Sequence, residues 1–332
     1  MSTTRITHPP VVGELKAIFA ALPDKELIAR LRGPRRRGRP GYDPEILWRT
    51  YICYYYLGLE SVSALIRILY DNPYIAAACG IHSPAEMPNQ STFSRFGSRL
   101  ARPLIRTLVR NVTRALTRAL YERFPDFGKS VAIDSTDIRA WSNGGKKGKD
   151  GKVTDKDAGW VVKSNTDGRK KFVWGYKVHI LADTHYELPL VVDTTAGNVH
   201  DIRKATPLLQ QARFTYRPFK PDYVICDAGY SSDKLRRTIK KQYHTEPIID
   251  PNPTHKRAVQ AAKKTADWRT IYRRRGGIER LNGRLKAFRK LNHVRVRGRF
   301  KVRIHVLLSI ITLQARALAF PAQMRDCVRA IA

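Results

Sequence analysis

The sequence lacks an uninterrupted apolar run long enough to cross a membrane. Its longest apolar stretch, Val306 to Phe320, contains Gln314 and Arg316 and is shorter than the ~20 residues that a spanning helix needs. The amino terminus, which begins Met1-Ser2-Thr3, shows no apolar segment of the secretory type. We therefore expect a cytoplasmic protein without a membrane span, in which this stretch forms a packed carboxy-terminal helix.

Cysteine is scarce as well. The four cysteines are scattered, each in or beside apolar sequence, and no two form a CxxC pair: Cys53, Cys79, Cys226 and Cys327. This pattern excludes a disulfide framework and a cysteine-ligated zinc site. It predicts reduced thiols in the core of a cytosolic protein.

Acidic residues are few relative to basic ones. The chain has 28 Asp and Glu against 62 Lys and Arg, which gives a formal net charge of +34. Such an excess is larger than solubility requires and indicates a polyanionic partner. Nucleic acid is the main candidate, and an anionic membrane surface is the alternative.

The length of 332 residues predicts about two domains. Residues 1–121 have a helical pattern throughout and predict an all-helical amino-terminal domain that binds DNA. Residues 122–332 alternate strand-like and helical segments, which predicts an α/β domain: a mixed sheet with flanking helices and a carboxy-terminal helix.

Two features of the amino-terminal region predict contacts with DNA. The basic run at 34–40 contains Arg35, Arg36 and Arg37 and has the composition of an exposed arm or a solvated linker. Short helices around Arg95, with a polar helix start at 89–92, are similar to a helix-turn-helix arrangement.

In the second region we predict short apolar strands and intervening helices. The strands are expected at 130–133, 172–182, 187–195, 223–226 and 247–249, and the helices at 201–212, 232–242 and around Glu279. The Gly- and Lys-rich segment 141–171 is predicted to be a mobile basic loop.

Two aspartates stand where predicted strands end. Asp134 follows the strand at 130–133 and Asp227 follows the strand at 223–226. If these strands are neighbours, the carboxylates lie within a few ångströms of each other, and Glu279 can complete a triad. Three carboxylates in one site need cations between them, and hard oxygen ligands suit Mg²⁺ or Mn²⁺. We expect two ions, with Asp134, Asp227 and Glu279 as both catalytic residues and metal ligands.

The segment around Glu279 has an informative spacing. On a continuous helix, Tyr272, Arg275, Glu279 and Lys286 fall within roughly 60° of one another. If the bound ions act on a phosphodiester, we expect Arg275 and Lys286 to bind its scissile phosphate and Tyr272 to pack on the adjacent strand. Gly276 and Gly277 could break this helix. An adjoining apolar stripe is predicted at Ile278, Leu281, Leu285 and Phe288.

Other polar residues near the predicted site are candidates for structural or supporting roles. They are His179, Asp183, Asp193, His200 and Asp201. Asp137 is the main rival to Asp134 as the first acid, although it lies three residues beyond the predicted strand end.

The sequence resembles the DDE transposases of bacterial insertion sequences, in particular the group of insertion-sequence families four and five. The resemblance rests on Ala132-Ile133-Asp134-Ser135-Thr136, Gly175-Tyr176-Lys177-Val178-His179, Gly197-Asn198-Val199-His200-Asp201 and Asp227-Ala228-Gly229-Tyr230. Tyr272, Arg275, Glu279 and Lys286 match the Y-(2)-R-(3)-E-(6)-K signature of the group at all four positions. The segments 38–44 and 90–96 are similar to its helical amino-terminal domain.

The resemblance implies a ribonuclease-H-like catalytic domain in which the first and fourth strands are adjacent. It implies a transposase that binds terminal inverted repeats in double-stranded DNA and catalyses metal-dependent cleavage and strand transfer. We expect a homodimer in the DNA complex, target DNA as a further partner and no small-molecule cofactor. The alternatives are a metal-dependent nuclease without strand joining and a catalytically inactive DNA-binding repressor.

The chain departs from some members of the group, which carry a large β-rich insertion between the second acid and the glutamate. Asp227 and Glu279 are 279 − 227 = 52 positions apart, which leaves no room for that insertion. In those members the insertion assists hairpin formation on the transposon end, so the excision pathway of this protein stays open.

Overall fold

A computed structural model describes residues 10–33, 41–142, 144, 152–164, 169–251 and 266–323. The basic arm at 34–40, with Arg35, Arg36 and Arg37, lies outside the described residues, and so do Cys327 and much of the segment 141–171. Cys53, Cys79 and Cys226 are free and buried, as predicted.

The amino-terminal region is helical, as predicted. Its elements are α1 (Pro10–Ala20), α2 (Lys25–Arg32), α3 (Pro44–Tyr56), α4 (Val62–Asp71), α5 (Pro73–Ala78), the 3₁₀ turn η1 (Pro84–Glu86), α6 (Gln90–Leu100) and α7 (Pro103–Arg123). Asp43, Ser61 and Asn89 cap α3, α4 and α6 through side-chain hydrogen bonds to backbone N–H groups. Pro103 begins α7, so α6 and α7 are two separate helices.

The second region contains a mixed sheet with flanking helices, which confirms the predicted fold class. Its elements are β1 (Ser130–Arg139), β2 (Gly159–Ser164), β3 (Lys170–Asp183), β4 (Pro189–Ala196), α8 (Ile202–Thr215), β5 (Tyr223–Cys226), the 3₁₀ turn η2 (Ala228–Tyr230), α9 (Asp233–Tyr243), β6 (Glu246–Ile249), α11 (Ala266–Arg273), α12 (Gly276–Phe288) and α13 (Arg299–Ala319). β2 lies in the segment that was predicted to be a loop.

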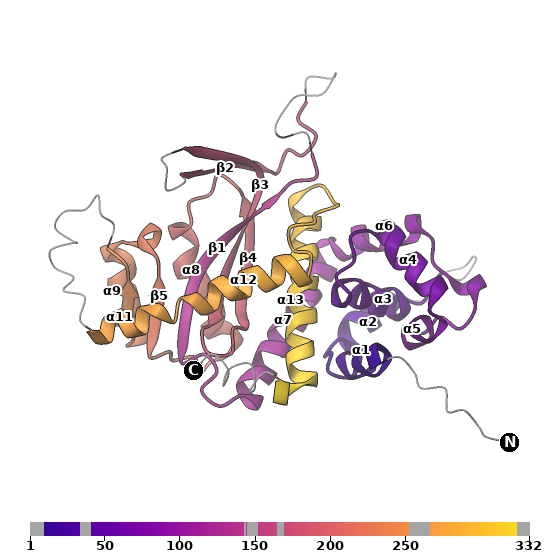
Figure 1. The fold of residues 1–332 in the computed structure, drawn as a ribbon, viewed down its shortest axis with the longest axis horizontal. Coiled ribbons are helices and arrows are strands. Elements are labelled where there is room, and N and C mark those ends of the chain that lie inside the picture. The colour runs from indigo at the N-terminus through magenta and orange to yellow at the C-terminus, as the bar shows by residue number, and fades with distance from the viewer. Residues whose placement is uncertain are drawn as a thin grey trace.

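The sheet has the strand order β2-β3-β1-β5-β6, with β4 also paired to β3. β3 is antiparallel to β1, β2 and β4, whereas β5 is parallel to both β1 and β6. Apart from the extra strand β2, this is the ribonuclease-H-like order. In Figure 1, α12 crosses in front of β1, and α13 stands beside α7 between the sheet and the helical region.

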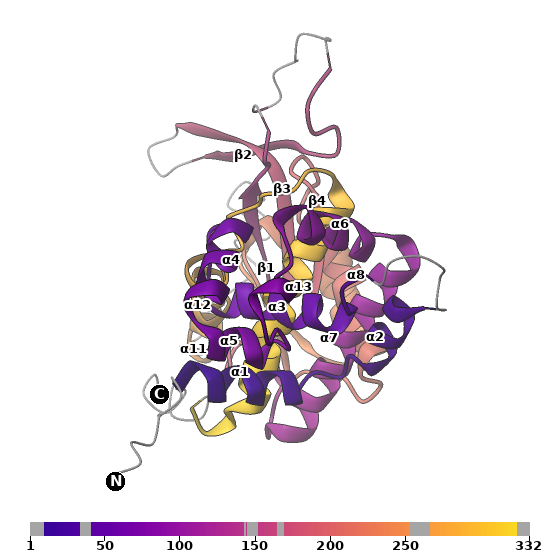
Figure 2. The ribbon, with the colours of Figure 1, turned by 90° about the vertical axis from the view of Figure 1, so that its right-hand side faces the viewer.

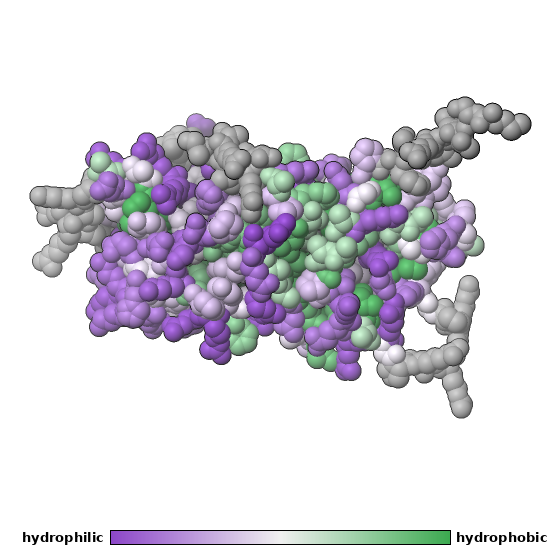
Figure 3. All heavy atoms as spheres, turned by 90° about the horizontal axis from the view of Figure 1, so that it is seen from below, coloured by the Kyte–Doolittle hydropathy of each residue, from purple (hydrophilic) through white to green (hydrophobic). Residues whose placement is uncertain are grey.

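Two hydrophobic clusters meet at α13. One lies under the sheet and includes Val306 and Ile310, and the other lies among the amino-terminal helices and includes Leu308 and Ile311. Figure 2 shows α13 running behind the amino-terminal helices, in front of the sheet. Seen from below, hydrophilic residues crowd the end that carries α9 and α11, whereas apolar residues gather towards the middle (Figure 3).

The predicted carboxy-terminal helix exists but begins earlier, at Arg299 instead of Val306. Because it begins before the apolar stretch at 306–320, α13 has 21 residues and is long and apolar enough to cross a membrane by length and composition alone. However, 78% of its most apolar window is buried inside the protein. Its apolar surface is therefore that of a central packing helix.

Candidate active site

The register of β1 and β5 brings the two aspartates to one place. The two parallel strands pair from Ser130 opposite Tyr223 to Ile133 opposite Cys226, so Asp134 and Asp227 each follow the last pair. The predicted adjacency of these strands is confirmed. The prediction that β1 ends before Asp134 was wrong, because β1 continues to pair with β3 as far as Arg139.

The start of α12 is held unusually close to the sheet. A Cβ atom added to Gly277 would lie 2.5 Å from the backbone oxygen of Thr184, the residue that follows β3. Only glycine allows this approach, because the obstacle is backbone and cannot move aside. Gly277 therefore sets how closely α12, which carries Glu279, approaches β1.

Arg275 stands where the three carboxylates converge. Its Nη1 lies 2.5 Å from Oε1 of Glu279, and its Nη2 lies 3.5 Å from Oδ2 of Asp227 and 3.8 Å from Oδ1 of Asp134. Burial on its own would lower the pKa of Arg275, but the three carboxylates outweigh it and raise that pKa. Among the described residues, no group of three His, Cys, Asp or Glu side chains has the arrangement of a metal site. Here the carboxylates are joined through a guanidinium.

Asp134 is the most buried of the three acids. Burial raises its pKa to about 6, although Arg275 and the N–H of Ser135 favour the charged form. The side chain of Asn282 donates a hydrogen bond of 3.0 Å from Nδ2 to Oδ2 of Asp134, and its own Oδ1 has no hydrogen-bond partner among the described residues. Asn282 was not among the predicted site residues. Its position three residues after Glu279, on the same side of a helix, was the available signal.

The signature segment is not one continuous helix. α11 ends at Arg273 and α12 begins at Gly276, and a turn at 274–275 joins them. The turn keeps helical dihedral angles at Arg275, and the N–H of Ile278 still donates to the carbonyl of Arg275, 3.1 Å away. The direction of the chain is therefore nearly preserved, which is why Arg275 and Glu279 still meet.

The remaining predicted contacts are spread over the molecule. Tyr272 is half-buried and stacks on Trp268, with ring centroids 4.7 Å apart. Lys286 is partly exposed in the last turn of α12, and Arg95 is exposed on α6 in the helical region. Phe288 was wrongly placed in the apolar stripe: it is 64% exposed, whereas the other three members are fully buried.

The rival acid Asp137 and two of the acids predicted to have structural or supporting roles have other surroundings. Asp137 is three residues from Asp134 on the same strand, so its side chain points to the opposite face of the sheet. Asp183 is buried and accepts hydrogen bonds from the N–H groups of Gly128, His185 and Tyr186. Asp193 is bound by Lys204 and Arg303, each at 2.7 Å.

His179 and His200, the two candidate histidines, differ in exposure. His179 is fully buried on the face of the sheet that α8 covers, where its Nε2 lies 2.8 Å from the Thr195 hydroxyl. Its Nδ1 lies 3.6 Å from Asp201. His200 is exposed just before α8. These contacts tie α8 to β3 and β4.

The sheet order, the paired aspartates and the basic helix beside them define an α/β enzyme of the ribonuclease-H-like class. Residues 126–314 match the family model described as Transposase DDE domain, and residues 9–99 match a second model, Transposase domain (DUF772). The chain belongs to the transposase DDE domain family. It is thus an enzyme that cleaves and transfers DNA.

Two individual proteins are similar to this chain. The putative transposase for insertion sequence element IS6501 from Brucella ovis is 31% identical over 115 residues, which are 35% of this chain and 78% of that protein. A solved structure of the piggyBac transposase synaptic complex with hairpin DNA aligns with 97% of this chain and 82% of its own, at 11% identity and a TM-score of 0.42.

Proposed function

We propose that this transposase binds the terminal inverted repeats of its insertion sequence and cuts and joins DNA at the site formed by Asp134, Asp227 and Glu279. The observation that carries the proposal is the convergence of these three carboxylates on one guanidinium, that of Arg275. Acidic side chains are rare in this chain, so their gathering beside a basic helix is a specific feature.

The donor set fits a divalent cation. All three ligands would be hard carboxylate oxygens, which suit Mg²⁺ or Mn²⁺, and they already surround a positive group. We propose that Asp134, Asp227 and Glu279 hold two such ions. When bound, the ions would supply activation of a water or 3′-hydroxyl and stabilisation of the leaving oxygen of a phosphodiester.

The surrounding side chains would orient the acids and the DNA. Asn282 holds one oxygen of Asp134 in place by its hydrogen bond. Arg275 and Lys286 would bind the phosphate at the cut site through charge-assisted hydrogen bonds, and Tyr272 would support the same helix face. Arg275 is well placed for this role, because its guanidinium already lies beside the acids.

We further propose that residues 1–121 recognise the terminal repeat, with Arg95 and the arm at 34–40 in contact with DNA. The separate family match over 9–99 and the exposure of Arg95 on α6 support a distinct role for this region. Residues 122–332 would then form the catalytic domain. Two copies would act together on double-stranded DNA in the bacterial cytoplasm, one at each transposon end.

The proposal is tested by substituting the acids one at a time. Asp134→Ala, Asp227→Ala and Glu279→Ala should each abolish cleavage and strand joining on a substrate that carries the element's ends. DNA binding measured by fluorescence anisotropy should be retained, since each change removes a carboxylate and no cation. Cleavage by the unaltered protein should require Mg²⁺ or Mn²⁺ and stop in EDTA.

Asp137→Ala is the matched control. It removes an acid from the same strand, three residues away and on the other face of the sheet. We expect this variant to retain cleavage. If Asp137→Ala were inactive and Asp134→Ala active, the assignment of the first acid would be wrong. Cleavage without strand joining by the unaltered protein would favour a nuclease.

A further inference from the structure

Four arginines form a regular row along α7. Arg106, Arg110, Arg114 and Arg118 recur every fourth residue, and we call them the arginine ladder. Residues four apart on a helix are neighbours, so the ladder extends for about 18 Å along one side of α7. None of the four is fully buried, and Arg118 is exposed.

The ladder has no acidic partner among the described residues. No ion pair is formed by any of its members in that part of the chain. The contacts it does make are with neutral groups: Arg110 reaches Gln211 at 3.4 Å, and Arg114 reaches Asn111 at 3.3 Å.

Aromatic rings hold two of the guanidinium groups. The guanidinium carbon of Arg106 lies 3.9 Å from the ring centre of Phe300, and that of Arg114 lies 4.8 Å from the ring centre of Phe214. Cation–π contacts restrict a guanidinium without neutralising its charge. Arg106 and Arg114 are therefore restricted in position, and no acid among the described residues pairs with their charges.

The cations of the ladder crowd one another and their neighbours. Burial, and then Arg110 and Arg299, lower the pKa of Arg106, and burial, Arg110 and Arg118 lower that of Arg114. Like charges at this spacing are unfavourable in the free protein. A polyanion bound along the row would relieve that repulsion.

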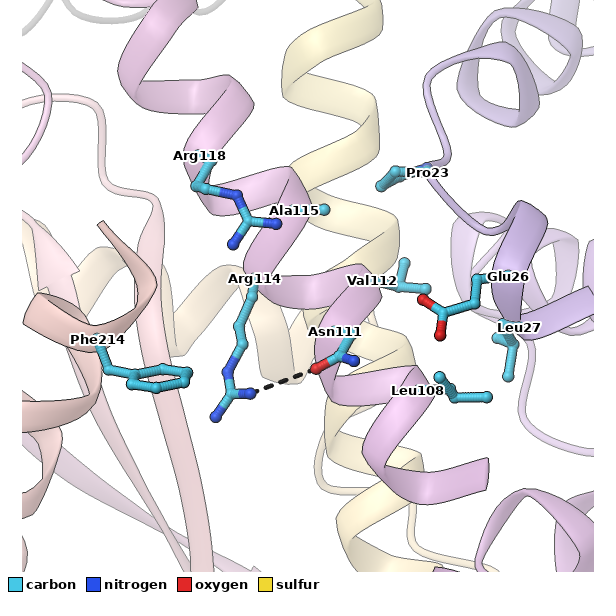
Figure 4. A pocket seen from close by; sticks show the side chains of 10 residues that line it. All are labelled: Pro23, Glu26, Leu27, Leu108, Asn111, Val112, Arg114, Ala115, Arg118 and Phe214. Carbon is cyan, nitrogen blue, oxygen red and sulfur yellow. Dashed lines mark hydrogen bonds between the residues drawn. The ribbon is translucent and has the colours of Figure 1, made fainter. Parts of the chain in front are cut away.

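The hollow beside the ladder has a definite shape. Figure 4 shows Arg114 and Arg118 on α7, with Phe214 of α8 on one side and Pro23, Glu26 and Leu27 on the other. Its volume is about 350 Å³, too small for a duplex, so only a segment of sugar-phosphate backbone could enter it. Glu26, which is exposed, is the one carboxylate among its lining residues.

We propose that the arginine ladder is a second DNA site, which binds the phosphate backbone of a duplex without reading its sequence. Arginines in a row contact phosphates and carry no base information, which suits DNA whose sequence is not fixed, such as flanking or target DNA. The ladder neighbours Arg303 on the α8 side of the sheet, whereas Asn282 of α12 binds Asp134 from the other side. The inference rests on the proposed function only in taking duplex DNA as the partner.

The test measures binding of a random-sequence 30-base-pair duplex by fluorescence anisotropy over a range of NaCl concentrations. In the ladder variant Arg110→Ala/Arg114→Ala/Arg118→Ala, the plot of log affinity against log salt should become shallower by roughly two to three, about 0.9 for each lost phosphate contact. At low salt the affinity should fall by about a hundred-fold.

The matched control removes three cations elsewhere. Lys234→Ala/Arg237→Ala/Lys241→Ala alters exposed residues of α9, at the hydrophilic end of the molecule in Figure 3. This variant should change the slope by less than one. Equal losses in the ladder and control variants would overturn the proposal, because the effect would then be one of net charge alone.

Glu26→Gln gives a test in which duplex binding is expected to become tighter instead of weaker. Removing the carboxylate from the hollow should tighten duplex binding by about two- to five-fold, and a folding defect cannot produce that result. Unchanged or weaker binding by Glu26→Gln would count against the ladder. Loss that appears only with single-stranded DNA would overturn the assignment of a duplex. If the unaltered protein bound no duplex at all, the proposed function would fail as well.

Discussion

At the scale of single residues, Arg275 has two possible partners. In this structure its guanidinium binds the carboxylates of Asp134, Asp227 and Glu279, whereas a cut site would offer it a phosphate. A guanidinium and a divalent ion placed among the same carboxylates compete, because like charges repel at short range. Arg275 should therefore weaken metal binding in the free protein and contribute to catalysis in the DNA complex.

We expect Arg275→Ala to bind Mn²⁺ at least as tightly as the unaltered protein in a calorimetric titration. The same variant should cleave roughly ten- to a thousand-fold more slowly, since it loses a charge-assisted contact at a reacting phosphate. Lys286→Ala is the comparison: we expect it to slow cleavage without tightening Mn²⁺ binding. Loss of Mn²⁺ binding by Arg275→Ala would show that the guanidinium organises the acids instead of competing at their site.

Asn282 should position Asp134. Removing its amide in Asn282→Ala leaves Asp134 without the 3.0 Å hydrogen bond and should reduce the cleavage rate by about ten-fold. The cost in stability should be only about 1 kcal/mol, the usual contribution of one hydrogen bond. A melting curve and a single-turnover cleavage assay measure the two effects. A variant that loses stability but cleaves normally would show that the contact is structural only.

The closeness of Arg275 and Glu279 could be predicted from their spacing, and that of Asp134 and Asp227 from their places after neighbouring strands. Arg275 and Glu279 are four apart, and that relation survived the turn at 274–275. The spacing places Asn282 on the same side of the helix as Glu279, but its contact with Asp134 depends on which strand faces α12, and spacing does not give that. A buried amide also looks the same in sequence as a solvated one.

At the scale of elements, Gly277 determines how closely α12 packs on the sheet, and Gly283 offers a control on the same helix. A side chain at Gly277 would collide with the backbone of Thr184, whereas nothing lies within 4 Å of a Cβ added to Gly283. We expect Gly277→Ala to lower the free energy of unfolding by about 1–3 kcal/mol and to displace Glu279, so cleavage should fall as well.

Gly283→Ala should instead raise that free energy by about 0.5–1 kcal/mol, because alanine favours a helix over glycine at an exposed position. Urea unfolding of Gly277→Ala and Gly283→Ala measures both changes in the free energy of unfolding. The close approach would be disproved if both substitutions stabilised the protein equally.

The lengths of the elements were harder to predict than their order. The apolar run at 130–133 marked only the part of β1 that also pairs with β5, whereas the polar remainder is held by β3. The backbone hydrogen bonds that pair two strands do not depend on side-chain polarity, so the polar end of a strand leaves little trace in the sequence. β2 was missed for a different reason: its short run Trp160-Val161-Val162 favours a strand, but the surrounding segment is dominated by Gly, Lys and Asp.

At the scale of the whole molecule, the central helix α13 joins the two regions. Within it, Val306 and Ile310 belong to the core under the sheet, and Leu308 and Ile311 belong to the core of the helical region. Gln314 donates both to the Thr117 hydroxyl of α7 and to a backbone carbonyl at the start of β4. A fragment of residues 122–332 would expose the side of α13 that the amino-terminal helices cover, so DNA recognition is better tested with Arg95→Ala in the full chain.

Because both cores include α13, we expect the protein to unfold as one cooperative unit. Leu308→Ala removes buried volume from the helical core and should cost about 2–5 kcal/mol. If unfolding is cooperative, that loss should appear equally in α3, which lies in the helical region, and in β1, which lies in the sheet.

Hydrogen exchange in low urea, followed by mass spectrometry of peptides from α3 and β1, measures the loss in each element. Lys301→Ala changes an exposed position of the same helix. It should change the free energy of opening of α3 and of β1 by no more than about 0.5 kcal/mol. Faster exchange in α3 alone would mean that the helical region unfolds independently and that α13 stays with the sheet.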